Sequence, residues 1–160
     1  MGPAPAAVRT VVFDIDGTLL DSAAGILAGF QHALRAGGVA VPAESELRVH
    51  LGPPLRDFLT LAGVPAERLD GAAEAYHDFY LAEGLQQAAP YDGVVELLGR
   101  LVEAGVTLAT ASAKRTTTAR AILEAHGLAA GCSSPPARRR WASSPVVVSA
   151  RVSTTSSGDW

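Results

Sequence analysis

The segment Val11-Val12-Phe13-Asp14-Ile15-Asp16-Gly17-Thr18-Leu19-Leu20-Asp21-Ser22 decides the fold. Its short apolar run indicates a buried strand over residues 9–16. Two aspartates lie one residue apart at the end of this run, and a strand would project both carboxylates to the same side. Paired carboxylates repel each other and lose hydration, so a cation or a shared proton usually offsets the cost. Because ligands bind at the carboxyl ends of strands in open α/β sheets, we expect a ligand site here.

With both acids, Gly17, Thr18 and the following Leu-Leu-Asp-Ser, the segment resembles the first signature of the haloacid dehalogenase superfamily, D-x-D-G-T. Most members of that superfamily are Mg²⁺-dependent phosphatases, so the resemblance implies phosphoryl chemistry. The second aspartate favours this chemistry, because true dehalogenases lack it. The alternatives are an acidic turn without function and a calcium loop of the EF-hand type. The calcium loop fails on spacing, since positions 6 and 12 counted from Asp14 are Leu19 and Gly25.

The resemblance assigns a role to each aspartate. Asp14 is the expected nucleophile, which attacks phosphorus and forms an aspartyl-phosphate. Asp16 is the expected general acid for the leaving alcohol and then the base that activates water. The resemblance also implies Mg²⁺ at Asp14 and Asp16, held by the carboxylate of the former and the backbone carbonyl of the latter. Phosphate contacts are implied for Gly17 and Thr18.

A second strand should bring a hydroxyl to a phosphate oxygen. The stretch Leu108-Ala109-Thr110-Ala111-Ser112-Ala113-Lys114 resembles the second signature, an apolar strand that ends in Ser or Thr. Counting back from the helix that contains Ile122 to Leu128, we align Ser112 with that position and keep Thr110 as the alternative. Lys114 is the single lysine of the chain and is a further candidate phosphate ligand. A hydroxyl at a strand end beside a helix N-terminus is a plausible anion contact.

The hydrophobic pattern predicts an α/β fold: a Rossmann-like parallel sheet core, incomplete, with an inserted all-helical cap subdomain. Helices are expected over 22–36, 43–50, 55–62, 66–83, 92–104 and 115–126, and a second strand over 106–111. The buried face of the helix over 92–104 is expected to comprise Val94, Val95, Leu97, Leu98, Leu101 and Val102. Ser22 is the expected N-cap of the first helix, and Gly37-Gly38 should end it. The core is expected to comprise residues 1–20 and 88–130, and the cap residues 21–87.

The helical insert resembles the cap of the phosphoglycolate-phosphatase-like branch, in His50-Leu51-Gly52-Pro53-Pro54-Leu55 and in Pro90-Tyr91-Asp92-Gly93-Val94. Such a cap closes over the site and excludes water. Arg56 and His50 are candidates to reach the substrate, although an ordinary surface role is the simpler interpretation of both. The aromatic residues 76, 79 and 80 fit the core stripe of a cap helix.

Composition limits the class of protein. No run approaches 18 apolar residues, so no membrane span is expected. The single cysteine, Cys132, excludes an internal disulfide, and a reducing cytoplasm is the simplest location. Residues 1–130 carry 9 basic and 15 acidic side chains, so no affinity for nucleic acid is expected. The oligomeric state is left open.

The chain changes character near residue 130. Eight of its 11 serines lie in residues 131–160, together with three prolines and the cluster Arg138 to Arg140. We expect an atypical and mostly disordered tail there, with only residues 145–148 able to form a strand. The lysine-bearing helix and the acidic strand end of the later superfamily signatures are missing. We therefore hypothesise a truncation or frameshift after about residue 130, and little or no activity for this chain.

The functional prediction is a Mg²⁺-dependent phosphatase of small phosphorylated metabolites, such as phosphoglycolate, a nucleotide or a sugar phosphate. Two alternatives remain: an inactive fragment that only binds phosphate compounds, and a sugar-phosphate mutase. A phosphonate hydrolase is disfavoured, because its cap would need a lysine and residues 20–90 contain none.

Overall fold

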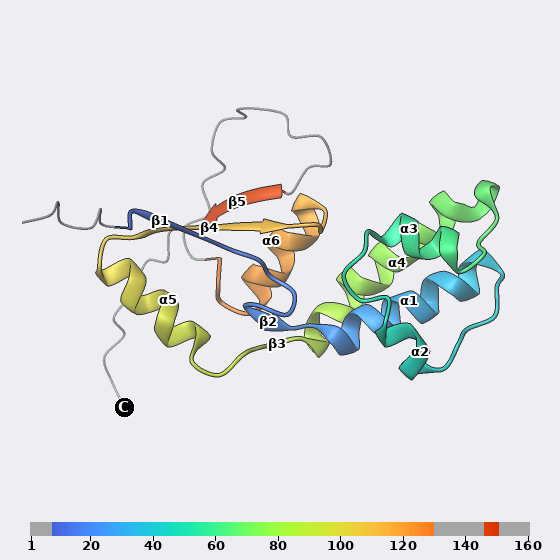
Figure 1. The fold of residues 1–160 in the computed structure, drawn as a ribbon, viewed down its shortest axis with the longest axis horizontal. Helices are drawn as coiled ribbons and strands as arrows, with labels where there is room; N and C mark the ends of the chain where they lie inside the picture. The colour runs from blue at the N-terminus through green and yellow to red at the C-terminus, as the bar shows by residue number, and fades with distance from the viewer. Residues whose placement is uncertain (1–7, 130–145, 151–160) are drawn as a thin grey trace, which may run out of the picture. The chain divides into compact units, whose positions relative to one another are not determined.

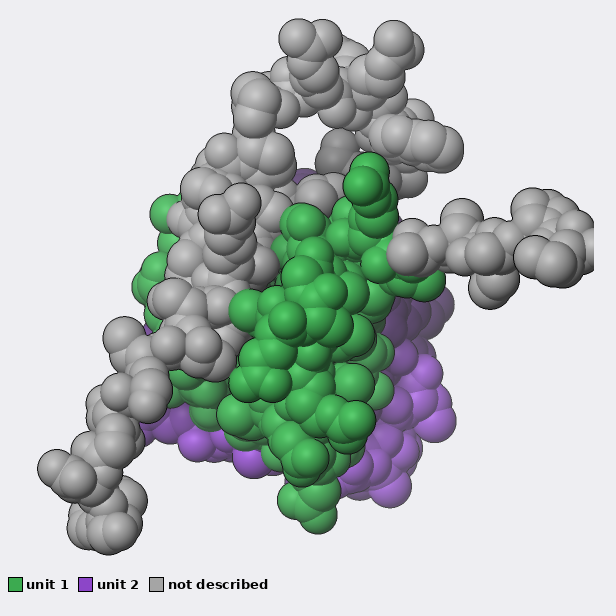
Figure 2. All heavy atoms as spheres, turned by 90° about the vertical axis from the view of Figure 1, so that its left-hand side faces the viewer, with its two compact units in different colours: residues 1–19, 90–160 green, residues 20–89 purple. Residues whose placement is uncertain are grey.

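The structure is a computed structural model, and it describes residues 8–129 and the backbone of residues 146–150. The chain divides into two compact units, residues 1–19 with 90–160 (unit 1) and residues 20–89 (unit 2), which Figure 2 shows in different colours. The predictions for Cys132, for the cluster Arg138 to Arg140 and for the rest of 130–145 and 151–160 fall outside the described residues.

Figure 1 labels the elements. Unit 1 contains β1 (Thr10–Phe13), α5 (Val94–Glu103), β4 (Thr107–Ser112), α6 (Thr116–Ala125) and β5 (Val146–Ala150). Unit 2 contains α1 (Ala23–Gly37), α2 (Glu44–Arg48), α3 (Leu55–Leu61), η1 (Ala66–Arg68), α4 (Leu69–Ala82) and η2 (Gly84–Gln87). The short strands β2 (Leu20–Asp21) and β3 (Ala89–Pro90) pair with each other where the chain passes from one unit to the other.

The sheet of unit 1 has the order β1-β4-β5. β1 and β4 are parallel and in register from Thr10 with Thr107 to Phe13 with Thr110, which confirms the predicted α/β class. The chain between them contains unit 2 and then α5, which is the last helix of the crossover that a parallel pair requires. β5 runs antiparallel to β4. Residues 146–148 of the run that the sequence offered as a possible strand lie in this strand of residues 146–150.

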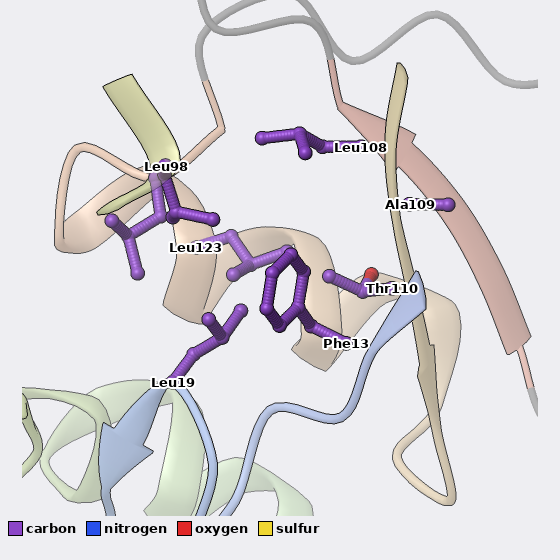
Figure 3. A pocket seen from close by; sticks show the side chains of 8 residues that line it. Phe13, Leu19, Leu98, Leu108, Ala109, Thr110 and Leu123 are labelled. Carbon is purple, nitrogen blue, oxygen red and sulfur yellow. The ribbon is translucent and has the colours of Figure 1, made fainter. Parts of the chain in front are cut away.

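The core of unit 1 lies between the sheet and the two helices α5 and α6. A small cavity of about 20 Å³ remains in this core, and Figure 3 shows the side chains around it. It is lined by Phe13, Leu19, Leu98, Leu108, Ala109, Thr110, Leu123 and Leu128. A space of this size holds at most about one water molecule, and the lining is almost wholly apolar. The cavity is therefore a packing gap and not a substrate site.

Unit 2 is a helical body built on α1 and α4. Phe30 of α1 stacks on Phe58 with ring centroids 4.1 Å apart and also meets Tyr76 of α4. Tyr76 in turn stacks on Tyr80, which is fully buried. Phe79 is only partly buried and stacks on His32 instead. Two of the three aromatic residues predicted for the core stripe therefore form it.

Glycine allows α1 to pack closely in unit 2. Gly25, Gly29 and Gly37 are buried on one side of α1. A Cβ built at Gly29 would come within 2.7 Å of the Tyr76 ring, and one at Gly37 within 2.9 Å of Val64. A Cβ at Gly25 would meet the carbonyl oxygen of Gly84. These glycines lower the helix propensity of α1. A larger residue at any of the three positions would collide with a neighbouring element.

Of three local predictions, two were wrong and one was confirmed. The first strand ends at Phe13 instead of residue 16, because Thr18 and Leu19 donate backbone hydrogen bonds to the carbonyl of Ile15 and turn the chain there. Ser22 is the N-cap residue of α1, as predicted, although its side chain makes no capping hydrogen bond. On α5, two residues expected in the buried face are exposed, Val95 at 61% and Leu97 at 48%.

Candidate active site

The two aspartates follow the carboxyl end of β1. The last ladder pair of β1 and β4 joins Phe13 to Thr110, so Asp14 leaves the sheet beside the end of its parallel neighbour. The next residues form a turn in which the amide of Leu19 donates to the carbonyl of Ile15 at 3.0 Å. Gly17 adopts φ 75° in this turn, a left-handed conformation that glycine adopts without strain. The local sequence thus ends the strand directly at the acidic pair.

The side chain of Lys114 comes from the other strand and contacts the acidic turn. Its Nζ lies 3.2 Å from Oδ2 of Asp16. Only 9% of the Lys114 side chain is exposed, against 26% of the Asp16 side chain, so this ion pair is largely withdrawn from water. A shielded ion pair is screened less by salt than one on the surface. The sequence placed both residues among the candidates but did not predict their contact.

Burial lowers the pKa of the Lys114 ammonium below its ordinary value of 10.5. The carboxylate of Asp16 opposes this effect most strongly, through its charge and a hydrogen bond, and the charge of Asp14 opposes it as well. Desolvation disfavours a charged ammonium, whereas nearby carboxylates favour it. Both aspartates therefore act electrostatically on one lysine, which indicates that the three side chains face a common region of unit 1.

Ser112 is the last residue of β4 and is 5% exposed. Its Oγ accepts a hydrogen bond from the backbone N–H of Lys114 at 3.3 Å. Thr110, the alternative hydroxyl, is equally buried but lines the apolar cavity in the middle of the core, as Figure 3 shows. The position at the strand end therefore favours Ser112 over Thr110 as the candidate hydroxyl, and its contact with phosphate stays a prediction.

Gly17 and Thr18 lie in the exposed turn after Asp16. A Cβ built at Gly17 would meet no atom within 4 Å, so the space above this residue is open. Asp14 is exposed as well. A ligand could therefore approach the exposed carboxylate of Asp14. The phosphate contacts of Gly17 and Thr18 stay predictions.

Asp14 and Asp16 are the candidate ligands for Mg²⁺. Across residues 8–129, no group of three or more His, Cys, Asp or Glu side chains is placed to hold a metal ion. Mg²⁺ nevertheless binds commonly through one or two carboxylates, with water and substrate phosphate as the other ligands. The hard oxygen donors of Asp14 and Asp16 fit that requirement, so these are the residues that would hold the ion.

The candidate residues of the helical insert belong to unit 2 and have partners there. Arg56 of α3 forms an ion pair with Asp70 of α4. His50 lies against the ring of Phe58, with centroids 5.5 Å apart. Both arrangements agree with the ordinary structural interpretation of these residues. Their role toward a substrate stays a prediction, as does the role of unit 2 as a cap.

The fold and the acidic pair agree with the comparisons to known proteins. The model of the family described as haloacid dehalogenase-like hydrolase matches residues 11–131. The chain therefore belongs to the haloacid dehalogenase-like hydrolase family. Within the part of the chain that the structure describes, no helix has the length and apolar character needed to cross a membrane.

The known proteins that are similar to this chain carry different names. The chain is 44% identical over 121 residues to the tyrosine-protein kinase PtkA of Mycobacterium tuberculosis, covering 75% of this chain and 41% of that protein. It is 32% identical to the phosphoglycolate phosphatase of Agrobacterium fabrum, covering 73% of this chain and 53% of the relative. A crystal structure from Clostridium acetobutylicum, described as a predicted phosphatase, superposes with a TM-score of 0.69 at 34% identity, covering 78% of this chain and 58% of that one. The chain thus spans about half the length of the relatives it matches.

Proposed function

We propose that this chain carries the nucleophile side of the active site of a phosphatase that acts on small phosphorylated metabolites. One observation carries the proposal: the acidic turn after β1 and the Ser112–Lys114 end of β4 meet, with Lys114 Nζ 3.2 Å from Asp16 Oδ2. Two carboxyl groups, a hydroxyl and an ammonium thus belong to the ends of two parallel strands, and the proposal assigns their chemical roles. Membership of the family and the similarity to a phosphoglycolate phosphatase support this assignment.

In the first half of the proposed reaction, a carboxylate oxygen of Asp14 attacks phosphorus. The bond from phosphorus to the leaving oxygen breaks, and Asp16 gives its proton to that oxygen, so an alcohol departs. Ser112 donates a hydrogen bond to a phosphoryl oxygen, and the ammonium of Lys114 balances the negative charge. The product of this half is an aspartyl-phosphate on Asp14.

In the second half, water attacks the phosphorus of the aspartyl-phosphate. Asp16, now ionised, accepts a proton from that water, and the bond from phosphorus to the Asp14 oxygen breaks. Inorganic phosphate leaves, and both carboxyl groups return to their initial states. When bound, Mg²⁺ supplies positive charge between the nucleophile and the phosphoryl oxygens.

The decisive experiment is phosphate release from a generic aryl phosphate in the presence of Mg²⁺. We expect slow, Mg²⁺-dependent release that Asp14→Asn reduces to background, because the amide cannot act as the nucleophile. Glu103→Gln, which neutralises an exposed acid at the end of α5 in the same unit, is the matched control and should leave the rate unchanged. Release that survives in Asp14→Asn contradicts the assigned nucleophile.

The alternative from another class is a protein that only binds phosphate compounds. It predicts no release in any variant, together with an increase in Tm when a phosphorylated metabolite is added. The sequence-based expectation of little activity makes this measurement necessary. The two readouts together separate an enzyme from a binding protein.

A second candidate function concerns the acceptor of the phosphoryl group. The 44% identity to a protein named as a tyrosine-protein kinase favours testing a hydroxyl acceptor as well as water. The same Asp14 chemistry would then pass the group to a tyrosine hydroxyl, or to a sugar hydroxyl in a mutase. Product analysis with a tyrosine peptide or a sugar phosphate distinguishes these from hydrolysis, because only hydrolysis releases inorganic phosphate in step with substrate loss.

A further inference from the structure

Two anionic groups compete for one cation at the candidate site. Lys114 is the single lysine of the chain, and its ammonium lies 3.2 Å from Asp16 Oδ2 with only 9% of the side chain exposed. In the proposed function the same ammonium balances the charge of the phosphoryl group. A lysine ammonium is a compact point charge, and moving it to a second anion weakens its pairing with the first.

We propose that Lys114 exchanges partners: it pairs with Asp16 in the resting site and turns to the phosphoryl oxygens when a substrate binds. The inference rests on the proposed function. It adds a resting state in which the ion pair is formed, and binding of a phosphoryl group breaks this pair. The ion pair thereby holds Asp16 in place as a carboxylate. Once the arriving phosphoryl group draws Lys114 away, Asp16 takes a proton from solvent and can serve as the general acid.

The anchoring of Lys114 supports the exchange. Its backbone N–H donates to Ser112 Oγ at 3.3 Å, so the lysine backbone is tied to the hydroxyl that is proposed to bind the same phosphate. The four-carbon stem beyond this anchor has rotatable bonds that let the ammonium change direction while the backbone stays fixed. Ser112 and Lys114 can therefore engage one phosphoryl group together.

The burial of the pair explains why an anion is required. Separating a shielded ammonium from its carboxylate leaves both charges poorly hydrated, which is costly unless a new partner replaces the old one. A phosphoryl group offers several strong acceptor oxygens and negative charge. Exchange is thus coupled to binding, whereas spontaneous opening of the pair is suppressed.

The test is the affinity for inorganic phosphate, measured by calorimetry without Mg²⁺ in four variants: Asp14→Asn, Asp16→Asn, Lys114→Met and the double variant Asp16→Asn with Lys114→Met. Asp14→Asn is the matched control, since it removes one negative charge from the same turn but leaves the ion pair intact. We expect Asp16→Asn to bind phosphate on the order of tenfold more tightly than Asp14→Asn, because it also removes the carboxylate that competes with phosphate for the lysine. In the Lys114→Met background this extra gain should disappear.

Each result decides the question. Equal affinities of Asp14→Asn and Asp16→Asn, or a gain that persists with Lys114→Met, would mean that the ion pair is permanent and would overturn the exchange. Absence of phosphate binding by Asp16→Asn would overturn it too. Lys114→Gln also removes the positive charge and takes the place of Lys114→Met if that variant does not fold. Failure of the phosphatase proposal is detected separately, as phosphate release that survives Asp14→Asn.

Discussion

At the carboxyl end of β4, the side chains of two residues make the contacts that define the candidate site. Lys114 brings a buried ammonium to the turn that follows β1, and Ser112 holds the backbone of that lysine. Buried polar groups usually have partners, and those at the strand end follow this rule. One buried hydroxyl of α6 differs: among the described residues, Oγ1 of Thr118 has no hydrogen-bond partner, although the residue is only 2% exposed.

Replacing Thr118 by valine should therefore stabilise the protein. Valine keeps the shape and removes a hydroxyl that loses its hydration on folding, and the two residues have similar helix propensities. We expect the free energy of unfolding to rise by about 1 kcal/mol in urea denaturation. Thr118→Ser keeps the hydroxyl but loses a buried methyl group, and should be less stable than the wild type. A less stable valine variant would show that the hydroxyl has a partner in solution.

The contact of Lys114 with Asp16 marks what the sequence could and could not predict about the site. Strand order and the two motifs predicted that the acidic turn and the end of β4 lie side by side, because parallel strands end at the same edge. Whether the lysine would turn toward the acids depends on side-chain burial, which no motif encodes. The presence of one lysine, two residues after a strand end opposite two acids, was the available signal.

At the scale of elements, the order of the longer strands and helices followed from the hydrophobic pattern, whereas the short strands β2 and β3 and the ends of the elements did not. α1 ends at Gly37, with Gly38 at φ 74° as its C-cap, as the glycine pair predicted. β1 stops three residues early because the turn at Ile15 competes with the strand for backbone hydrogen bonds. Val95 and Leu97 are exposed because only one side of α5 packs on the sheet, and periodicity over a short helix did not resolve which side.

The packing of α1 on α4 gives a prediction for Gly29→Ala. Alanine improves helix propensity by about 1 kcal/mol, but its Cβ would lie 2.7 Å from the Tyr76 ring, and overpacking costs roughly 1–3 kcal/mol. We expect a net loss of about 1 kcal/mol in the free energy of unfolding. Gly71→Ala is the matched control, because it lies in α4 with no atom within 4 Å of the added Cβ, and it should be stabilising. A stable Gly29→Ala would show that Tyr76 moves at little cost.

The ion pair between α3 and α4 makes a prediction about pH. The guanidinium of Arg56 holds the pKa of Asp70 below its ordinary value of 3.8, through a hydrogen bond and its positive charge. A carboxyl group with a lowered pKa in the folded state contributes stability above pH 3.8, and this contribution is lost as the pH falls through the lowered value. The effect should be small, because the pair is exposed.

The measurement is the urea midpoint of the wild type and of Asp70→Asn, from neutral pH to below pH 3.8. We expect the wild type to be slightly more stable near neutrality and the difference to vanish in acid. High salt should reduce the difference as well. A difference that is independent of pH would assign it to packing instead of charge.

At the scale of the whole molecule, the chain forms two compact units, and the sequence of unit 2 is inserted between the two segments of unit 1. Unit 2 begins at residue 20 and ends at residue 89, and β2 pairs with β3 at these two ends. Adjacent chain ends are typical of a domain that tolerates insertion. The buried side chains of unit 2 include Leu34, Leu47, Leu59 and Tyr80, so this unit has a core of its own.

We therefore expect residues 20–89 to fold when they are expressed alone. Domains of about this size can fold independently when they bury a single compact core, although their margin of stability is small. The isolated segment should show helical circular dichroism and a cooperative urea transition, because one core unites α1, α3 and α4. A variant with Phe30→Ala is the control, since loss of a buried aromatic ring costs roughly 3–5 kcal/mol and should abolish that transition. A gradual transition in the unmodified segment would mean that its core forms only when the rest of the chain is attached.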